Sequence, residues 1–80
     1  MVENLIDANI AIIGGGRFCR LFLQYLFENK VMDRSPKILG VADIDRRAEG
    51  LLFAEKVGLY TTTDFQELYD LDNLQVIVEL

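Results

Sequence analysis

Three consecutive glycines, Gly14, Gly15 and Gly16, stand between a short apolar run and a segment with helical apolar spacing. Glycine loses more backbone entropy on folding than any other residue, so three together indicate a sharp turn or a close approach by another group. At a strand-to-helix junction, this pattern is typical of a loop that holds a pyrophosphate against helix N–H groups. We therefore predict that Gly14 allows the turn and that Gly16 admits a pyrophosphate. A turn that only connects two elements is the alternative.

Two arginines, Arg17 and Arg20, follow the glycines. They place positive charge in the first turns of the expected helix, where the helix dipole disfavours it. A bound pyrophosphate would reverse that penalty. The alternative is that both side chains are only solvated, and for Arg20 we favour this interpretation.

An acidic residue, Asp43, closes the second apolar run. In a dinucleotide site such a residue accepts hydrogen bonds from the adenosine ribose. It lies further from the glycines than the usual ~20 residues, and the polar segment 30–36 accounts for the excess. A carboxylate repels a 2′-phosphate and so favours NAD over NADP, although the adjacent Arg46 and Arg47 weaken this preference. The alternative for Asp43 is a strand-end turn residue, and Asp45 is expected to cap a helix.

The third position of the glycine pattern is occupied by Cys19. A helix N-terminus lowers the pKa of a thiol, but this position should face the sheet, so we expect an inert, buried cysteine. The absence of histidine excludes Ser/His/Asp and Cys/His catalysis and the usual zinc sites. No catalytic or metal-binding residue is predicted. The candidate cofactor-binding residues are Gly14, Gly15, Gly16, Arg17, Phe18, Asp43 and Asp45.

The composition limits the partners. A net charge of −5 argues against nucleic acid or an anionic membrane surface, because either would need a basic patch. No apolar run approaches the ~20 residues of a membrane span. The single cysteine fits a reducing environment, so we expect a cytoplasmic protein.

The elements that must position these residues alternate along the chain. Strands are expected at 9–13, 37–42, 59–61 and 75–80, and helices at 17–29, at 46–57 and from Thr63 to about residue 69. Gly58 should end the second helix in a left-handed conformation, and Thr63 should open a T-x-x-Q capping box. In the first helix, the spacing predicts a core face formed by Phe18, Leu21, Phe22, Tyr25 and Leu26.

This alternation predicts an α/β fold with a doubly wound, Rossmann-like parallel sheet of strand order 3-2-1-4 and helices on both faces. The fourth strand is apolar on both faces, as in an interior strand. It would leave the sheet incomplete at that edge, which allows self-association there. We expect residues 1–80 to form a single dinucleotide-binding domain that is a fragment of a longer chain.

The segments IAIIGGGRFCR, ILGVADIDRRAEGLLFAEKVGLYTTTDFQEL and LQVIVEL resemble the N-terminal NAD(P)-binding domain of the glucose-fructose oxidoreductase and inositol dehydrogenase family. Homoserine dehydrogenase-like domains are similar. The resemblance covers residues 9–80 and implies that the dinucleotide is held by Gly14, Gly16, Arg17 and Asp43. Cys19, Glu79 and Leu80 depart from the family pattern.

The resemblance implies an oxidoreductase whose hydride chemistry uses a lysine, and often a histidine, from a second α/β domain that has no counterpart here. Two functions therefore remain open. One is the cofactor half of an NAD-dependent oxidoreductase. The other is a non-catalytic nucleotide-sensing domain, of the kind found ahead of PAS and histidine kinase modules in bacterial signalling proteins. A degenerate fold that binds nothing is a third alternative.

Overall fold

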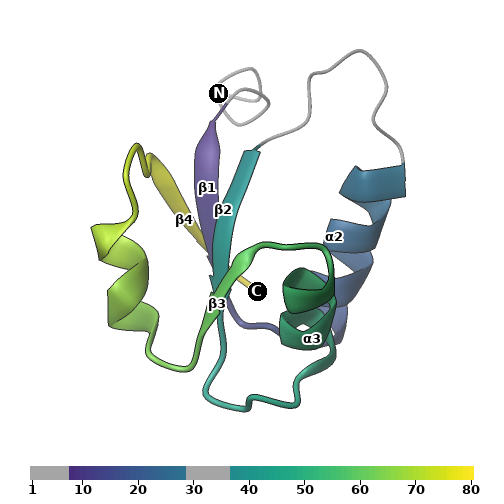
Figure 1. Ribbon diagram of the computed structural model, residues 1–80. Helices are drawn as coiled ribbons and strands as arrows, with labels where there is room; N and C mark the ends of the chain where they lie inside the picture. The colour runs from purple at the N-terminus through teal and green to yellow at the C-terminus, as the bar shows by residue number, and fades with distance from the viewer. Residues whose placement is uncertain (1–7, 29–36) are drawn as a thin grey trace.

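A four-stranded parallel sheet forms the centre of the computed structural model, which describes residues 8–28 and 37–80 (Figure 1). The strands are β1 (Asn9–Ile13), β2 (Lys37–Ala42), β3 (Tyr60–Thr62) and β4 (Val76–Glu79). Their order is β3-β2-β1-β4, and all three pairings are parallel. The predicted α/β class and strand order are confirmed, and the topology is Rossmann-like.

Helices cover both faces of the sheet. On one face lie α2 (Arg17–Glu28) and α3 (Glu49–Lys56), and on the other lies the 3-10 helix η1 (Phe65–Asp70) (Figure 1). The alternation of strand side chains divides the core accordingly. Ile10, Ile12 and Val41 pack with α2 and α3, whereas Ala11 and Ala42 pack with Leu68 of η1. This arrangement brings the carboxyl ends of β1 and β2 together beside the start of α2.

The buried face of α2 differs from the predicted one. Cys19, Leu23 and Leu26 are buried, whereas Phe18 is 76% exposed and Tyr25 is 63% exposed. Leu21 is 46% exposed as well, so expecting Phe18, Leu21 and Tyr25 in the core was wrong. Eight of the twelve residues of this helix are apolar, and they form two overlapping stripes of the same period, so periodicity alone does not choose between them.

The start of α3 was also predicted too early. Residues 46–48 form a turn, because Asp45 Oδ1 accepts from the Arg47 N–H over 2.9 Å and the Asp45 carbonyl accepts from the Ala48 N–H over 3.0 Å. The helix begins at Glu49 with Ala48 at its N-cap, so Asp45 is a turn residue and not the cap. At the other end of the helix, Gly58 has a φ of +89°, which confirms the left-handed stop.

The third helical element is a 3-10 helix whose N-cap is Asp64, so the predicted capping box at Thr63 was wrong. Asp64 Oδ1 accepts from the Gln66 N–H over 3.0 Å. Thr62 helps to set this turn, because its Oγ1 accepts from the Asp64 N–H over 3.0 Å. The strands shift by one residue at most from the expected bounds, and the expected end of the first helix at Asn29 lies outside the described residues.

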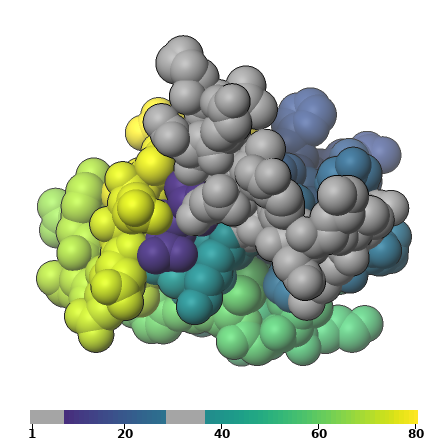
Figure 2. Space-filling view, turned by 90° about the horizontal axis from the view of Figure 1, so that it is seen from above, coloured from purple at the N-terminus to yellow at the C-terminus, as the bar shows by residue number. Residues whose placement is uncertain are grey.

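One edge of the sheet is formed by β4. Val76 and Val78 lie opposite Ile10 and Ile12 of β1, and no other described strand pairs with β4. The view along the strands in Figure 2 shows the yellow β4 segment on the outside of the molecule beside purple β1. The predicted pairing of this strand on one side only is confirmed. Within the described ranges, no helix is long and apolar enough to cross a membrane.

Candidate functional site

The glycine loop, residues 14–16, joins β1 to α2 at the carboxyl end of the sheet. The Gly14 N–H donates to the Ala42 carbonyl over 2.8 Å, so the loop is attached to the end of β2. Gly14 has a φ of +107°, and a Cβ atom there would lie 2.5 Å from the Leu80 carbonyl oxygen. The fold itself therefore requires glycine at position 14.

The Gly15 peptide links the loop to Asp43, directly after β2, and to the first turn of α3. Its N–H donates to Asp43 Oδ2 over 2.7 Å. Its carbonyl accepts from the Gly50 N–H over 2.6 Å and from the Leu51 N–H over 3.0 Å. Since Ala48 provides no side-chain cap, the Gly15 carbonyl fills the N-terminus of α3.

Gly16 differs from its two neighbours. It is exposed, its φ lies outside the left-handed region, and a Cβ atom there would have no heavy atom of another described segment within 4 Å. Nothing in the described fold requires glycine at this position. The open space beside Gly16 is therefore available to a bound molecule.

The N-terminus of α2 borders that space. The first backbone hydrogen bond of this helix runs from the Arg20 N–H to the Gly16 carbonyl over 3.0 Å. The N–H groups of Arg17, Phe18 and Cys19 precede it and have no intrahelical acceptor. The two helix N-termini at this end of the sheet therefore differ. N–H groups at the start of α3 donate to the Gly15 carbonyl, whereas the first three N–H groups of α2 donate to no backbone carbonyl of the described residues.

The carboxylate of Asp43 is held by backbone groups on both sides. Oδ2 accepts from Gly15, and Oδ1 accepts from the Asp45 N–H over 2.8 Å. Each carboxylate oxygen has a second lone pair, so both can still accept a hydroxyl hydrogen. The side chain next to it, Ile44, is 90% exposed, and sequence analysis did not single it out. Its apolar character directly after the acidic residue was the available signal.

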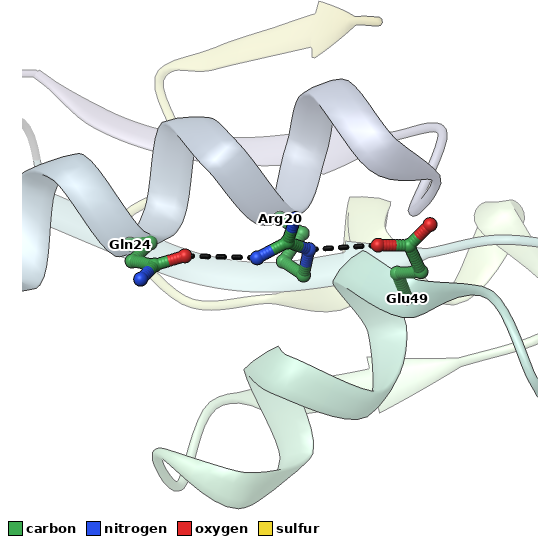
Figure 3. Close-up of polar contacts among 3 residues, drawn as sticks. All are labelled: Arg20, Gln24 and Glu49. Atoms are coloured by element: carbon green, nitrogen blue, oxygen red, sulfur yellow. Dashed lines mark hydrogen bonds and ion pairs between the residues drawn. The ribbon is translucent and has the colours of Figure 1, made fainter.

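Arg20 points away from the glycine loop, toward α3. Its Nε donates to Glu49 Oε1 over 2.7 Å, and a terminal nitrogen of its guanidinium group donates to Gln24 Oε1 over 2.9 Å (Figure 3). The expectation that this arginine is only solvated was wrong, because it forms an ion pair between α2 and α3. Arg17 is exposed beside the open helix end and remains the nearest cation of α2 for an anion there.

The thiol of Cys19 is buried at the start of α2, as expected. Desolvation raises the pKa of Cys19 to about 11, and the Asp43 carboxylate adds to this effect. The thiol is therefore protonated at neutral pH, and the thiolate required for nucleophilic or redox chemistry is scarce.

Comparisons of the chain with protein-family models, with curated proteins and with solved structures find no significant match. The features of the chain that bear on function are therefore its Rossmann-like topology and the geometry of this loop. The structure brings the loop, the start of α2 and Asp43 together at one end of the sheet.

Proposed function

We propose that the chain binds an NAD-type dinucleotide, with the pyrophosphate at the N-terminus of α2, and that it is the cofactor-binding half of an oxidoreductase. The observation that carries this proposal is the open space at Gly16. Gly14 is explained by its backbone angle and by Leu80, and Gly15 by its packing against Leu51 and Asp43. Gly16 has no such explanation within the described fold, and a ligand that must approach the backbone supplies one.

The remaining candidate residues support the same placement. The N–H groups of Arg17 and Phe18 would donate to phosphate oxygens, and the Arg17 guanidinium would add a positive charge. Asp43 would accept the ribose hydroxyls through its free lone pairs. Ile44 offers an exposed apolar surface next to it for the adenine. Asp45, also exposed, lies on the same connection.

A non-catalytic nucleotide sensor uses the same binding step and is the alternative function. The described site has groups that would hold a cofactor, but it has no counterpart of the lysine and histidine that the resemblance assigns to the hydride chemistry. The resemblance to the glucose-fructose oxidoreductase and inositol dehydrogenase family supports the oxidoreductase, with NAD as cofactor and NADP as the alternative. Both functions require dinucleotide binding, so binding is the step to test first.

The test compares two variants by thermal unfolding with ADP, NAD and NADP. Ligand at ten times its Kd stabilises the parent chain by ~1.4 kcal/mol, which raises Tm by roughly 6–11 °C in a domain of this size. Gly16→Asp should keep or raise Tm without ligand, because aspartate is a favourable N-cap. It should lose the ligand-induced shift, because its carboxylate occupies and repels the phosphate position.

Gly58→Ala is the matched control. It forces a side chain into a left-handed conformation at the far end of α3, which costs about 1–2 kcal/mol, but it leaves the glycine loop unchanged. This variant should melt earlier and still show the full ligand shift. A shift that survives in Gly16→Asp, or no shift in the folded parent at millimolar ligand, would contradict the proposed site.

The cofactor preference is tested at Asp43. Asp43→Asn keeps one carbonyl-type acceptor for the Gly15 N–H but removes the negative charge. NAD should bind more weakly, and the ratio of NADP to NAD affinity should rise, because the 2′-phosphate is no longer repelled. Asp70→Asn changes the net charge equally on η1 and should leave the ratio unchanged. An unchanged ratio in Asp43→Asn would remove Asp43 from the ribose site.

We also propose that chains self-associate through the outer edge of β4. The observation behind this is the half-buried apolar run Val76, Ile77 and Val78, which is paired on one side only among the described strands. Unpaired N–H and C=O groups on such an edge attract another strand.

A further inference from the structure

The third glycine position of the loop pattern carries Cys19, yet the loop and α3 still approach closely. Gly50 makes this approach possible. A Cβ atom at Gly50 would lie 2.7 Å from Cys19 Cβ, 2.8 Å from Cys19 Sγ and 2.8 Å from the Gly15 carbonyl oxygen. Such distances are shorter than real Cβ contacts, so any larger residue would displace the loop or the cysteine.

We propose that Gly50 is a positioning residue of the glycine loop: because it has no side chain, α3 can lie against Cys19 of α2 and against the Gly15 carbonyl. This inference rests on the proposed function insofar as it concerns the dinucleotide. The absence of a side chain at Gly50 allows the Gly50 and Leu51 N–H groups to donate to the Gly15 carbonyl.

The sign of the stability change caused by Gly50→Ala distinguishes this role from that of an ordinary helical glycine. Alanine is favoured over glycine inside a helix by up to ~1 kcal/mol, so Gly50→Ala should stabilise a chain in which Gly50 has no contacts. In this structure, the added methyl group should instead displace the Gly15 peptide. A loop displaced from its place beside α2 would also misplace the phosphate-binding N–H groups.

The experiment measures two quantities in the parent, in Gly50→Ala and in the double variant with Cys19→Gly. The first is hydrogen exchange at the Gly15 amide relative to amides of the β1–β2 ladder, and the second is affinity for ADP. Gly50→Ala should speed the relative exchange and weaken ADP binding, each by about tenfold, the effect of an overpacking cost near 1.4 kcal/mol. Cys19→Gly should recover part of both losses, because it removes two of the three short contacts.

Gly40→Ala is the matched control, because a Cβ atom there would also meet tight neighbours, 3.1–3.2 Å away, but in the interior of β2. It should lower stability without changing the relative Gly15 exchange or the ADP affinity. An unchanged Gly15 exchange in Gly50→Ala, or no recovery in the double variant, would overturn the inference. If the parent binds no ADP, the proposed function fails, and the exchange ratio still decides the role of Gly50.

Discussion

The backbone N–H of Gly15 donates to Oδ2 of Asp43 over 2.7 Å, joining residues 28 positions apart in the chain. The glycine loop and the acidic residue at the end of β2 are therefore in contact before any ligand binds. A loop held in this way loses little further entropy on binding, which favours affinity. Asp43 consequently has a structural role in addition to its proposed contact with a ribose.

The three glycines of the loop should differ in their tolerance to substitution. Gly14→Ala should lower the free energy of unfolding by about 2–4 kcal/mol, since it adds left-handed strain and a clash with Leu80. Gly16→Ala should cost less than about 1 kcal/mol, because only N-cap preference changes. Chemical denaturation of both variants measures the difference, and equal losses would show that the space at Gly16 is not open.

Cys19 should make the folded state less stable in alkaline solution. Burial raises its pKa from 9.0 to about 11, so between these values the folded chain retains a proton that the unfolded chain releases. Stability is therefore lost as pH rises through this window. Urea denaturation should show a steeper alkaline decline in the parent than in Cys19→Ala. Parallel declines would contradict the raised pKa.

Glu67 should make the folded state less stable as the pH falls, whereas Cys19 does so as the pH rises. Hydrogen bonds from the Thr62 and Tyr60 hydroxyls lower the pKa of its carboxyl group below the ordinary 4.5. The stabilisation is present above that ordinary value and is lost as pH falls through the lower folded value. Glu67→Gln keeps the acceptor oxygen but removes the charge, so its acid-induced decline should be shallower. Glu55→Gln, an exposed change on α3, should retain the decline of the parent.

The β4 edge should control association between chains. Val76→Lys places a charge on the edge, which discourages strand pairing, and sedimentation should show less association at high protein concentration. Leu52→Lys, at an exposed apolar position on α3, is the matched control and should associate like the parent. Equal association in both variants would place the contact elsewhere.

The sequence predicted the strands well because buried parallel strands are short apolar runs bounded by glycine and polar residues. It also placed the loop and Asp43 at the same end of the sheet, since the carboxyl ends of parallel strands meet there. The rotation of α2 was not predictable, because both of its stripes are apolar. With the observed face of α2 buried, Cys19 lies against Gly50 and Arg20 forms its ion pair with Glu49. Both contacts are with α3, which is distant in the sequence.

The role proposed for Gly50 was not predictable from the sequence either. Nothing local distinguishes a glycine that a neighbouring helix requires from one that a helix merely tolerates. The early start predicted for α3 has a related cause, since the group that fills its N-terminus is the carbonyl of Gly15, far away in the sequence. Capping rules that search neighbouring side chains do not find such a partner.

The strand order also has a consequence during synthesis of the chain. β1 lies in the middle of the sheet, but its partner β4 follows much later, and the Asn9 N–H bonds a side chain 66 positions further on. At ribosomal rates of ~5–20 residues per second, β4 appears about 3–13 s after β1. Throughout that interval the N–H and C=O groups on that edge of β1 lack their partner strand. The nascent chain is then most open to aggregation and to capture by a chaperone.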